Sequence, residues 1–143
     1  MGTDARGLTV TCDAAAELAA IDDFAHRILR LTAGAEIVLV AAEMHADVPM
    51  LALDAAALYL FALTSEGDRA AAQYLDRAAV LKPRKLPREA QLDAALRAWH
   101  RHDFSAAAAS SCASRGSMRG FSMAARSKYW AATRSPSEVS AKR

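Results

Sequence analysis

Apolar residues before about residue 110 recur at the spacing of an α-helix, and this period limits the possible folds more than any other feature of the chain. Ala71, Leu75 and Ala78 lie three or four residues apart, which places them on one helix face. No segment shows the apolar and polar alternation of a half-buried strand. The β-branched run at residues 37–40 lies between Ala and Glu residues, which favours part of a buried helix. The sequence therefore predicts an all-α fold.

Two central helices are predicted to form a hairpin. The first ends near Ser65, where Gly67 supplies a C-terminal stop, and Asp68 caps the second. Pro83 ends the second helix. Because so short a turn brings antiparallel helices close together, we expect small residues such as Ala71 at their contact.

The spacing of Ala71, Leu75, Ala78 and Pro83 resembles the second helix of a tetratricopeptide repeat. Pro49 precedes Pro83 by 34 residues, which equals the period of that repeat. An earlier copy then has a leading helix whose apolar face is formed by Ile21, Phe24, Ala25 and Ile28. The resemblance implies antiparallel helical hairpins stacked as a short tetratricopeptide-like right-handed solenoid. A plain antiparallel helical bundle is the alternative, because it would contain many of the same alanines.

A second resemblance is carried by residues 87–89 (Pro-Arg-Glu), Ala95, Trp99 and residues 103–104 (Asp-Phe), together with Asp47. This pattern resembles the N-terminal part of the tetratricopeptide repeat protein 38 family, over about residues 8–109. The resemblance implies a superhelical repeat scaffold with no established reaction. The family's His-Ala pair has no counterpart here, so no role for that histidine is transferred.

We expect three segments: an N-terminal segment (residues 1–10), three helical-hairpin repeats (11–114) and a basic Ser/Arg-rich tail without regular structure (115–143). Thr11 or Asp13 is predicted to cap a first helix that stops at Gly34, and a second helix spans about residues 35–46. The predicted helix-packing residues are Ile21, Phe24, Ala25, Ile28, Leu58, Ala71, Leu75, Ala78 and Ala95.

Charge divides the chain into two opposed parts. Residues 110–143 contain seven Lys or Arg and one Glu, a net charge of +6, whereas residues 1–109 carry 11 basic and 15 acidic side chains, a net charge of −4. Aromatic residues alternate with cations in the tail, at Phe121, Tyr129 and Trp130 among Arg119, Arg126 and Lys128. Such a pattern can stack on bases while cations meet phosphates. The alternatives are a tail without regular structure, or a truncated or out-of-frame product in place of further repeats.

A second basic stretch, residues 82–88, joins the second and third hairpins. We expect a solvated loop whose cations lie near the carbonyl end of the preceding helix. A binding patch is the less favoured interpretation.

The sequence favours a cytoplasmic protein without a membrane segment. The first residues lack a basic start followed by an apolar stretch, and the longest apolar window, residues 48–63, is shorter than the ~20 residues that span a bilayer. Cys12 and Cys112 are far apart and suggest neither a disulfide framework nor a metal pair.

No pattern of catalytic residues is present, and we expect neither an enzyme nor a cofactor. His100 and His102 are two residues apart and face different sides of a helix, whereas helical metal ligands are spaced by four. His26 and His45 have no Cys or carboxylate partner at ligand spacing.

We therefore expect a protein–protein interaction scaffold that binds a peptide or partner helix on a concave surface lined by the leading helices. The third hairpin has no predicted cover, so Leu92, Leu96 and Trp99 are expected to bind a partner or a second copy of the chain. The alternative function is a structural helical bundle whose basic tail binds nucleic acid or an acidic surface.

Overall fold

The computed structural model describes residues 1–81 and 84–113, and these residues are mostly helical, which confirms the all-α prediction. The predicted tail (115–143) and Pro83 lie outside the described residues. The elements in chain order are β1 (Gly2–Thr3), β2 (Thr9–Val10), α1 (Ala15–Arg30), α2 (Ile37–Met44), α3 (Pro49–Phe61), α4 (Ser65–Val80), α5 (Pro87–His100) and α6 (Phe104–Ala113).

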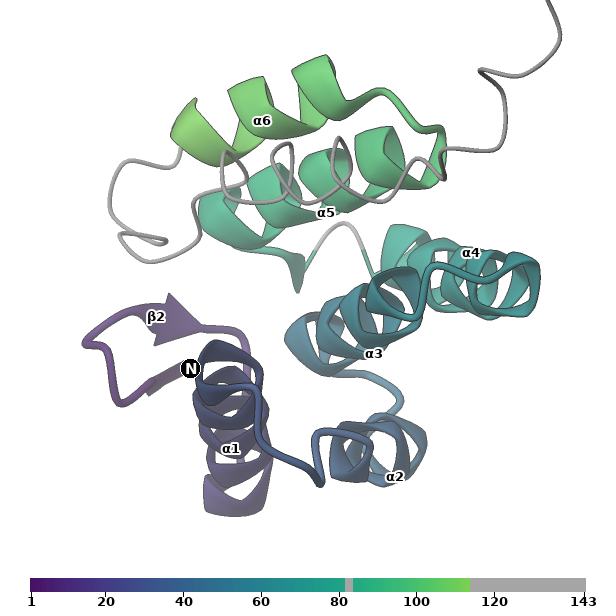
Figure 1. Ribbon diagram of the computed structural model, residues 1–143. Coiled ribbons are helices and arrows are strands. Elements are labelled where there is room, and N and C mark those ends of the chain that lie inside the picture. The colour runs from purple at the N-terminus through teal and green to yellow at the C-terminus, as the bar shows by residue number, and fades with distance from the viewer. Residues whose placement is uncertain (82–83, 114–143) are drawn as a thin grey trace, which may run out of the picture.

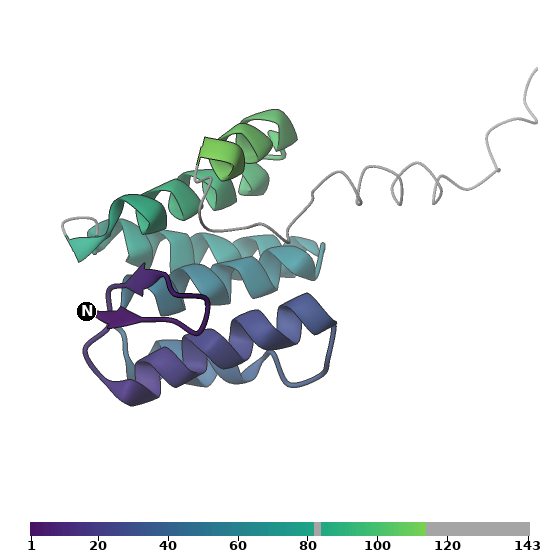
Figure 2. The same ribbon diagram turned by 90° about the vertical axis from the view of Figure 1, so that its left-hand side faces the viewer.

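Consecutive helices pair into three layers that follow the order of the chain. Figure 1 shows α1 and α2 at the bottom, α3 and α4 in the middle, and α5 and α6 at the top. Helix α3 contacts α1 and α2 in the layer below, α4 beside it, and α5 above. Figure 2 shows the same layers after a quarter turn. The middle layer therefore joins the other two.

Helix α3 is central because it is apolar on every side. Leu51 and Ala55 belong to a core cluster shared with α1 and α2, whereas Leu53 and Leu60 belong to a second cluster shared with α4, α5 and α6. A helix that is apolar all round is stable only when it is covered all round. Pro49 occupies its first turn, where the missing N–H has no helical partner in any case.

The turn between α3 and α4 differs from the prediction. Helix α3 ends at Phe61, and the Oγ1 of Thr64, not Asp68, caps α4 by accepting the N–H of Gly67 at 3.0 Å. Gly67 lies inside the first turn of α4, so its prediction as a helix stop is wrong. A Cβ at Gly67 would lie 2.6 Å from the carbonyl oxygen of Tyr59, so glycine is needed for the close approach of the two helices.

The start of α1 also differs from the prediction. Neither Thr11 nor Asp13 caps it; instead Oε2 of Glu17 accepts the N–H groups of Asp13 at 2.7 Å and Ala14 at 3.0 Å. The helix ends at Arg30, before the predicted Gly34, and α2 (37–44) is shorter than the predicted 35–46. A carboxylate in the first helical turn can accept hydrogen bonds from main-chain N–H groups at the helix start, as the hydroxyl of a capping residue does.

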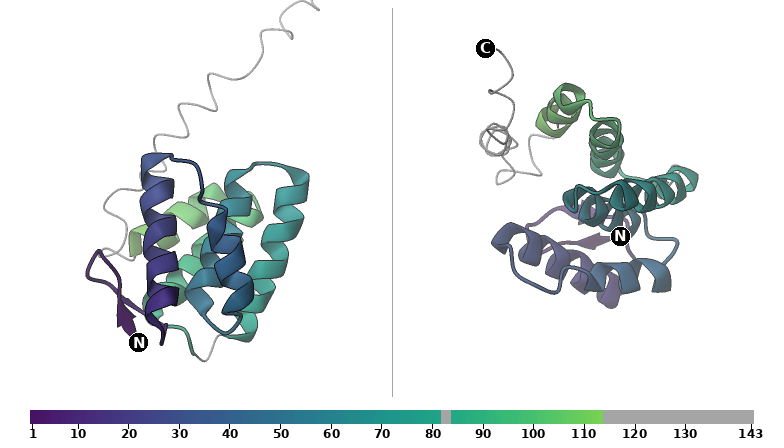
Figure 3. Two further views of the ribbon diagram at one scale, coloured as in Figure 1. Left: turned by 90° about the horizontal axis from the view of Figure 1, so that it is seen from below. Right: turned by 45° about the vertical axis from the view of Figure 1, so that its right-hand side comes forward.

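The N-terminal segment contains a small antiparallel sheet that the sequence did not predict. Gly2 pairs with Val10, and Thr3 pairs with Thr9. Strands of two residues are too short to show a period. Val10 and Cys12 are buried in the same core cluster as α1, and the hairpin lies beside that helix (Figure 3, left).

Candidate functional site

The predicted helix-packing residues occupy two environments. Buried side chains are Ile21, Phe24, Ala71, Leu75, Ala78 and Ala95. Half-buried side chains are Ala25, Ile28 and Leu58. Ile28 and Leu58 pack at the edge of the first core cluster, so α1 turns only part of its apolar stripe into the core.

The predicted partner-binding residues are not an exposed surface. Leu96 and Trp99 are 4% and 9% exposed, and Leu92 is half-buried between the two core clusters. The ring of Trp99 packs edge-on against Phe61, with centroids 5.1 Å apart. The expectation that nothing covers this face is wrong, because α3 and α6 pack on α5.

An exposed apolar surface lies instead on α2. Ile37, Val40 and Met44 are 53%, 61% and 73% exposed, and their spacing places them on one side of the helix, opposite the buried Val38. A shallow hollow of about 430 Å³ is lined by Leu39, Val40, Glu43 and Met44. We call the side chains of Ile37, Val40 and Met44, with this hollow, the α2 surface.

Polar groups from α4 border the α2 surface at Glu43. The hydroxyl of Tyr74 donates to Oε1 of Glu43 at 2.9 Å, and Arg77 donates to the same oxygen at 3.0 Å. The guanidinium of Arg77 also lies 5.6 Å from the centre of the Tyr74 ring. The hydrogen bond from Tyr74 lowers the pKa of Glu43, and burial together with Glu43 raises the pKa of Tyr74 to about 12. Glu43 is therefore a fixed, ionised group at the edge of this apolar surface.

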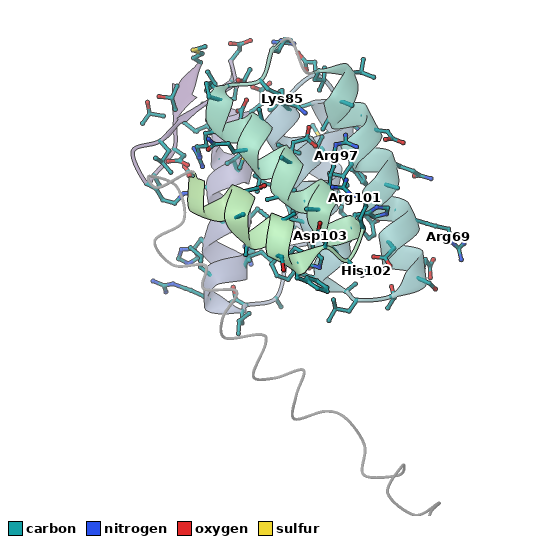
Figure 4. The ribbon with its side chains drawn as sticks, turned by 90° about the horizontal axis from the view of Figure 1, so that it is seen from above. Arg69, Lys85, Arg97, Arg101, His102 and Asp103 are labelled. Carbon is teal, nitrogen blue, oxygen red and sulfur yellow. The ribbon has the colours of Figure 1, made fainter. Side chains whose placement is uncertain are left out.

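Basic side chains of the joint between α4 and α5 lie in two environments. The Nζ of Lys85, whose side chain is 1% exposed, lies 2.5 Å from Asp93, so the expectation of a solvated loop is wrong for Lys85. Arg84 is exposed to solvent, as expected, and pairs with the exposed Asp47 at 3.0 Å. Farther along α5, Arg97 points toward α4, whereas Arg69 extends from α4 into solvent (Figure 4).

A buried polar cluster forms where the N-terminal segment crosses the start of α5. Glu89 is fully buried, and its carboxylate accepts the N–H of Thr11 at 2.7 Å, the hydroxyl of Thr11 at 2.8 Å and the N–H of Leu86 at 2.9 Å. Arg88 donates to the carbonyl oxygen of Thr9 at 3.4 Å. Arg88 and Glu89, which are adjacent on α5, therefore bind main-chain groups of Thr9 and Thr11 in the N-terminal segment.

Asp4 is the second buried carboxylate of this cluster. It accepts hydrogen bonds from the N–H of Leu8 at 2.8 Å and from the guanidinium of Arg6 at 2.7 Å, and Arg88 lies 3.4 Å away. Burial raises the pKa of Asp4, but these donors and charges outweigh burial, so its pKa is lowered. Asp4 is therefore ionised at neutral pH.

Asp54 on α3 is the third carboxyl of the cluster. It is 5% exposed, and its Oδ2 is buried without a hydrogen-bond partner. Burial raises its pKa well above the ordinary value, against the opposing charges of Arg6 and Arg88. The charges of Glu89 and Asp4 raise it further. Asp54 therefore differs from Asp4 in favouring its neutral form.

Two of the histidines, His45 and His100, contact groups of neighbouring helices. Nδ1 of His45 lies 3.2 Å from Glu17, and Nε2 of His100 lies 3.1 Å from the carbonyl oxygen of Asp68. Among the described residues, no group of three or more His, Cys, Asp or Glu side chains is arranged to hold a metal ion. No helix in the described ranges is long and apolar enough to cross a membrane.

Comparison with known proteins finds no family model, no curated protein and no solved structure that matches this chain.

Sequence reasoning missed both the α2 surface and the buried polar cluster. The first has a sequence signal, since every residue of 37–44 except Glu43 is apolar, which is more than one buried helix face can hold. The second has only a partial signal, the Glu three residues after Leu86, which is typical of a capped helix start. Its contacts with Thr11 join residues 78 positions apart and leave no local pattern.

Proposed function

We propose that this chain is a protein–protein interaction scaffold of the tetratricopeptide-like type. The stacking of helix pairs in chain order supports this proposal, as does the contact of α3 with both α1 and α5, which brings the leading helices together. In the proposed arrangement the pairs form a short right-handed solenoid, related to the tetratricopeptide repeat protein 38 family. We propose that this chain acts in the cytoplasm.

The α2 surface is the observation that carries the proposal, and it lies on the second helix of the first pair, not on the leading helices that the sequence favoured. Three large apolar side chains, each more than half exposed, share one helix face next to a shallow apolar hollow. A contiguous apolar patch with a polar rim marks an interaction site on a small domain. Glu43 supplies part of that rim. The partner that fits is an amphipathic helix or peptide whose apolar side chains cover Val40 and Met44.

Aspartate substitutions on the α2 surface test this function. Val40→Asp and Met44→Asp each place a charge where the partner packs. Proteins that are captured by cross-linking to the parent chain should no longer be captured by these variants. Because both side chains are exposed, the melting temperature should change little. Val80→Asp is the control, since Val80 is 81% exposed on α4 and is not one of the side chains that line the hollow on α2.

The result that contradicts the proposal is an unchanged set of captured proteins in Val40→Asp and Met44→Asp. Loss of the same partners in Val80→Asp would also contradict it, because binding would then depend on general surface hydrophobicity. Self-association through the third hairpin is not part of the proposal, because Leu96 and Trp99 are buried.

A further inference from the structure

The N-terminal segment lies on the leading helices as a bound peptide would. Arg88 donates to the carbonyl oxygen of Thr9, and Glu89 accepts the N–H of Thr11. Between these two contacts the side chain of Val10 is fully buried, and Cys12, two residues on, is 4% exposed. Main-chain recognition combined with pockets for alternate side chains is how proteins bind extended peptides.

A charge contact adds selectivity to this arrangement. The side chain of Asp4 is fully buried and lies between Arg6 of the segment and Arg88 of α5, at 2.7 and 3.4 Å. Arg88 therefore contacts the segment twice, at the carboxylate of Asp4 and at the carbonyl oxygen of Thr9. An uncharged residue at position 4 would remove this ion pair with Arg88.

The segment depends on the helices more than on its own sheet. Its strands have two residues each, and a two-stranded hairpin of this kind is marginally stable by itself. The segment also contributes two of the charged groups around Asp54, Arg6 and Asp4.

We propose that the surface of α1, α3 and α5 beneath residues 4–12 is a peptide-binding site occupied by the chain's own N-terminal segment. When the segment leaves, the site takes an extended peptide that carries a carboxylate for Arg88 and two apolar side chains at alternate positions. This inference rests on the proposed scaffold function. It adds that the N-terminal segment regulates peptide binding by occupying the site. The α2 surface and this site are separate, so each can fail without the other.

Hydrogen exchange in the full chain tests the release. The N–H groups of Leu8 and Thr11 are bonded to Asp4 and Glu89, and they should exchange through a local opening that does not depend on denaturant. The N–H groups of α3 should exchange only through global unfolding. Exchange of Leu8 and Thr11 at the global rate would overturn the inference, because the segment would then be an inseparable part of the core.

Competition by a labelled peptide of residues 1–13 tests the binding site. A tethered segment has an effective concentration in the mM range, so the parent chain should bind the peptide weakly. Asp4→Asn in the full chain removes the charge contact with Arg88 and should raise affinity for the peptide about tenfold, which corresponds to ~1.4 kcal/mol. Asp23→Asn, which breaks the ion pair with Arg27 on α1, is the matched control and should leave affinity unchanged.

A peptide that itself carries Asp4→Asn should bind the variant chain more weakly than the parent peptide does. Thr11→Val is a second variant, which removes the hydroxyl contact to Glu89 but keeps the N–H contact. It should also raise affinity for the peptide if Asp4→Asn fails to fold. Equal peptide affinity in the parent, Thr11→Val and Asp23→Asn chains would overturn the inference.

Discussion

Replacing Asp54 by asparagine is expected to raise the free energy of unfolding by an amount that grows with pH. The carboxyl is buried on α3, its Oδ2 has no hydrogen-bond partner, and burial raises its pKa well above the ordinary value of 3.8. Asparagine has nearly the same shape and never ionises. The comparison therefore isolates the ionisation of this one group.

The sign follows from proton binding. Above pH 3.8 the unfolded chain releases the Asp54 proton, while the folded chain keeps it until the raised pKa is reached. The folded state then binds more protons than the unfolded state, so the contribution of Asp54 to stability falls as pH rises. The parent loses about 1.4 kcal/mol of stability for each pH unit between 3.8 and the folded pKa. Above the folded pKa Asp54 is ionised in both states, so the total loss no longer changes with pH.

Urea denaturation of the parent and Asp54→Asn at pH 4, 5, 6 and 7 measures this difference. Carboxylates with lowered pKa values, such as Asp4 and Glu43, stabilise both proteins as pH rises, so their effects largely cancel in the difference. Asp47→Asn is a control, because the hydrogen bond from Arg84 lowers the pKa of Asp47 below 3.8. The pH-dependent part of its effect lies below pH 4, so its stability relative to the parent should stay nearly constant from pH 4 to pH 7.

A difference between the parent and Asp54→Asn that stays constant from pH 4 to pH 7 would refute the reasoning. It would mean that folding does not raise the pKa of Asp54, so that the charges of Arg6 and Arg88 at least balance the cost of burial.

Three further substitutions test the packing. Gly67→Ala should destabilise the fold by ~1 to 3 kcal/mol, because the new Cβ meets the carbonyl oxygen of Tyr59, although alanine ordinarily favours a helix. Thr64→Ala should cost ~1 kcal/mol through loss of the cap, and Thr64→Ser should restore most of it. Trp99→Ala should cost ~3 to 5 kcal/mol, whereas Leu63→Ala, at a side chain 68% exposed, should have little effect. Thermal or urea denaturation checks each value, and a neutral Gly67→Ala or Trp99→Ala would contradict the packing described for it.

Much of the helical framework is predictable because it depends on neighbours in sequence. The period of Ala71, Leu75 and Ala78 places these residues on one face of α4, and all three are buried. Pro87 and Glu89 mark the start of α5 in the same local way. Such signals depend on side chains a few residues apart, whose relative positions a helix fixes by itself.

Cap positions were harder to predict, because two local signals competed for the same turn. Gly67 next to Asp68 has the appearance of a helix end and a new cap, yet Thr64 caps α4 and the glycine lies within it. The deciding contact is between that glycine and the carbonyl oxygen of Tyr59 on α3. The approach of two helices, not the preference of one residue, set the boundary.

The sequence by itself determined that this chain is helical, where its helices approximately lie and which faces of them are apolar. Only the tertiary structure decided which apolar faces are covered: Trp99 is enclosed by its neighbours, whereas Val40 is exposed. It also decided that Glu89 meets Thr11, 78 residues away, and that Asp54 is buried without a full set of partners. The physical reason is that periodicity reports the shape of one helix, while burial and pKa depend on groups that the fold brings together from distant positions.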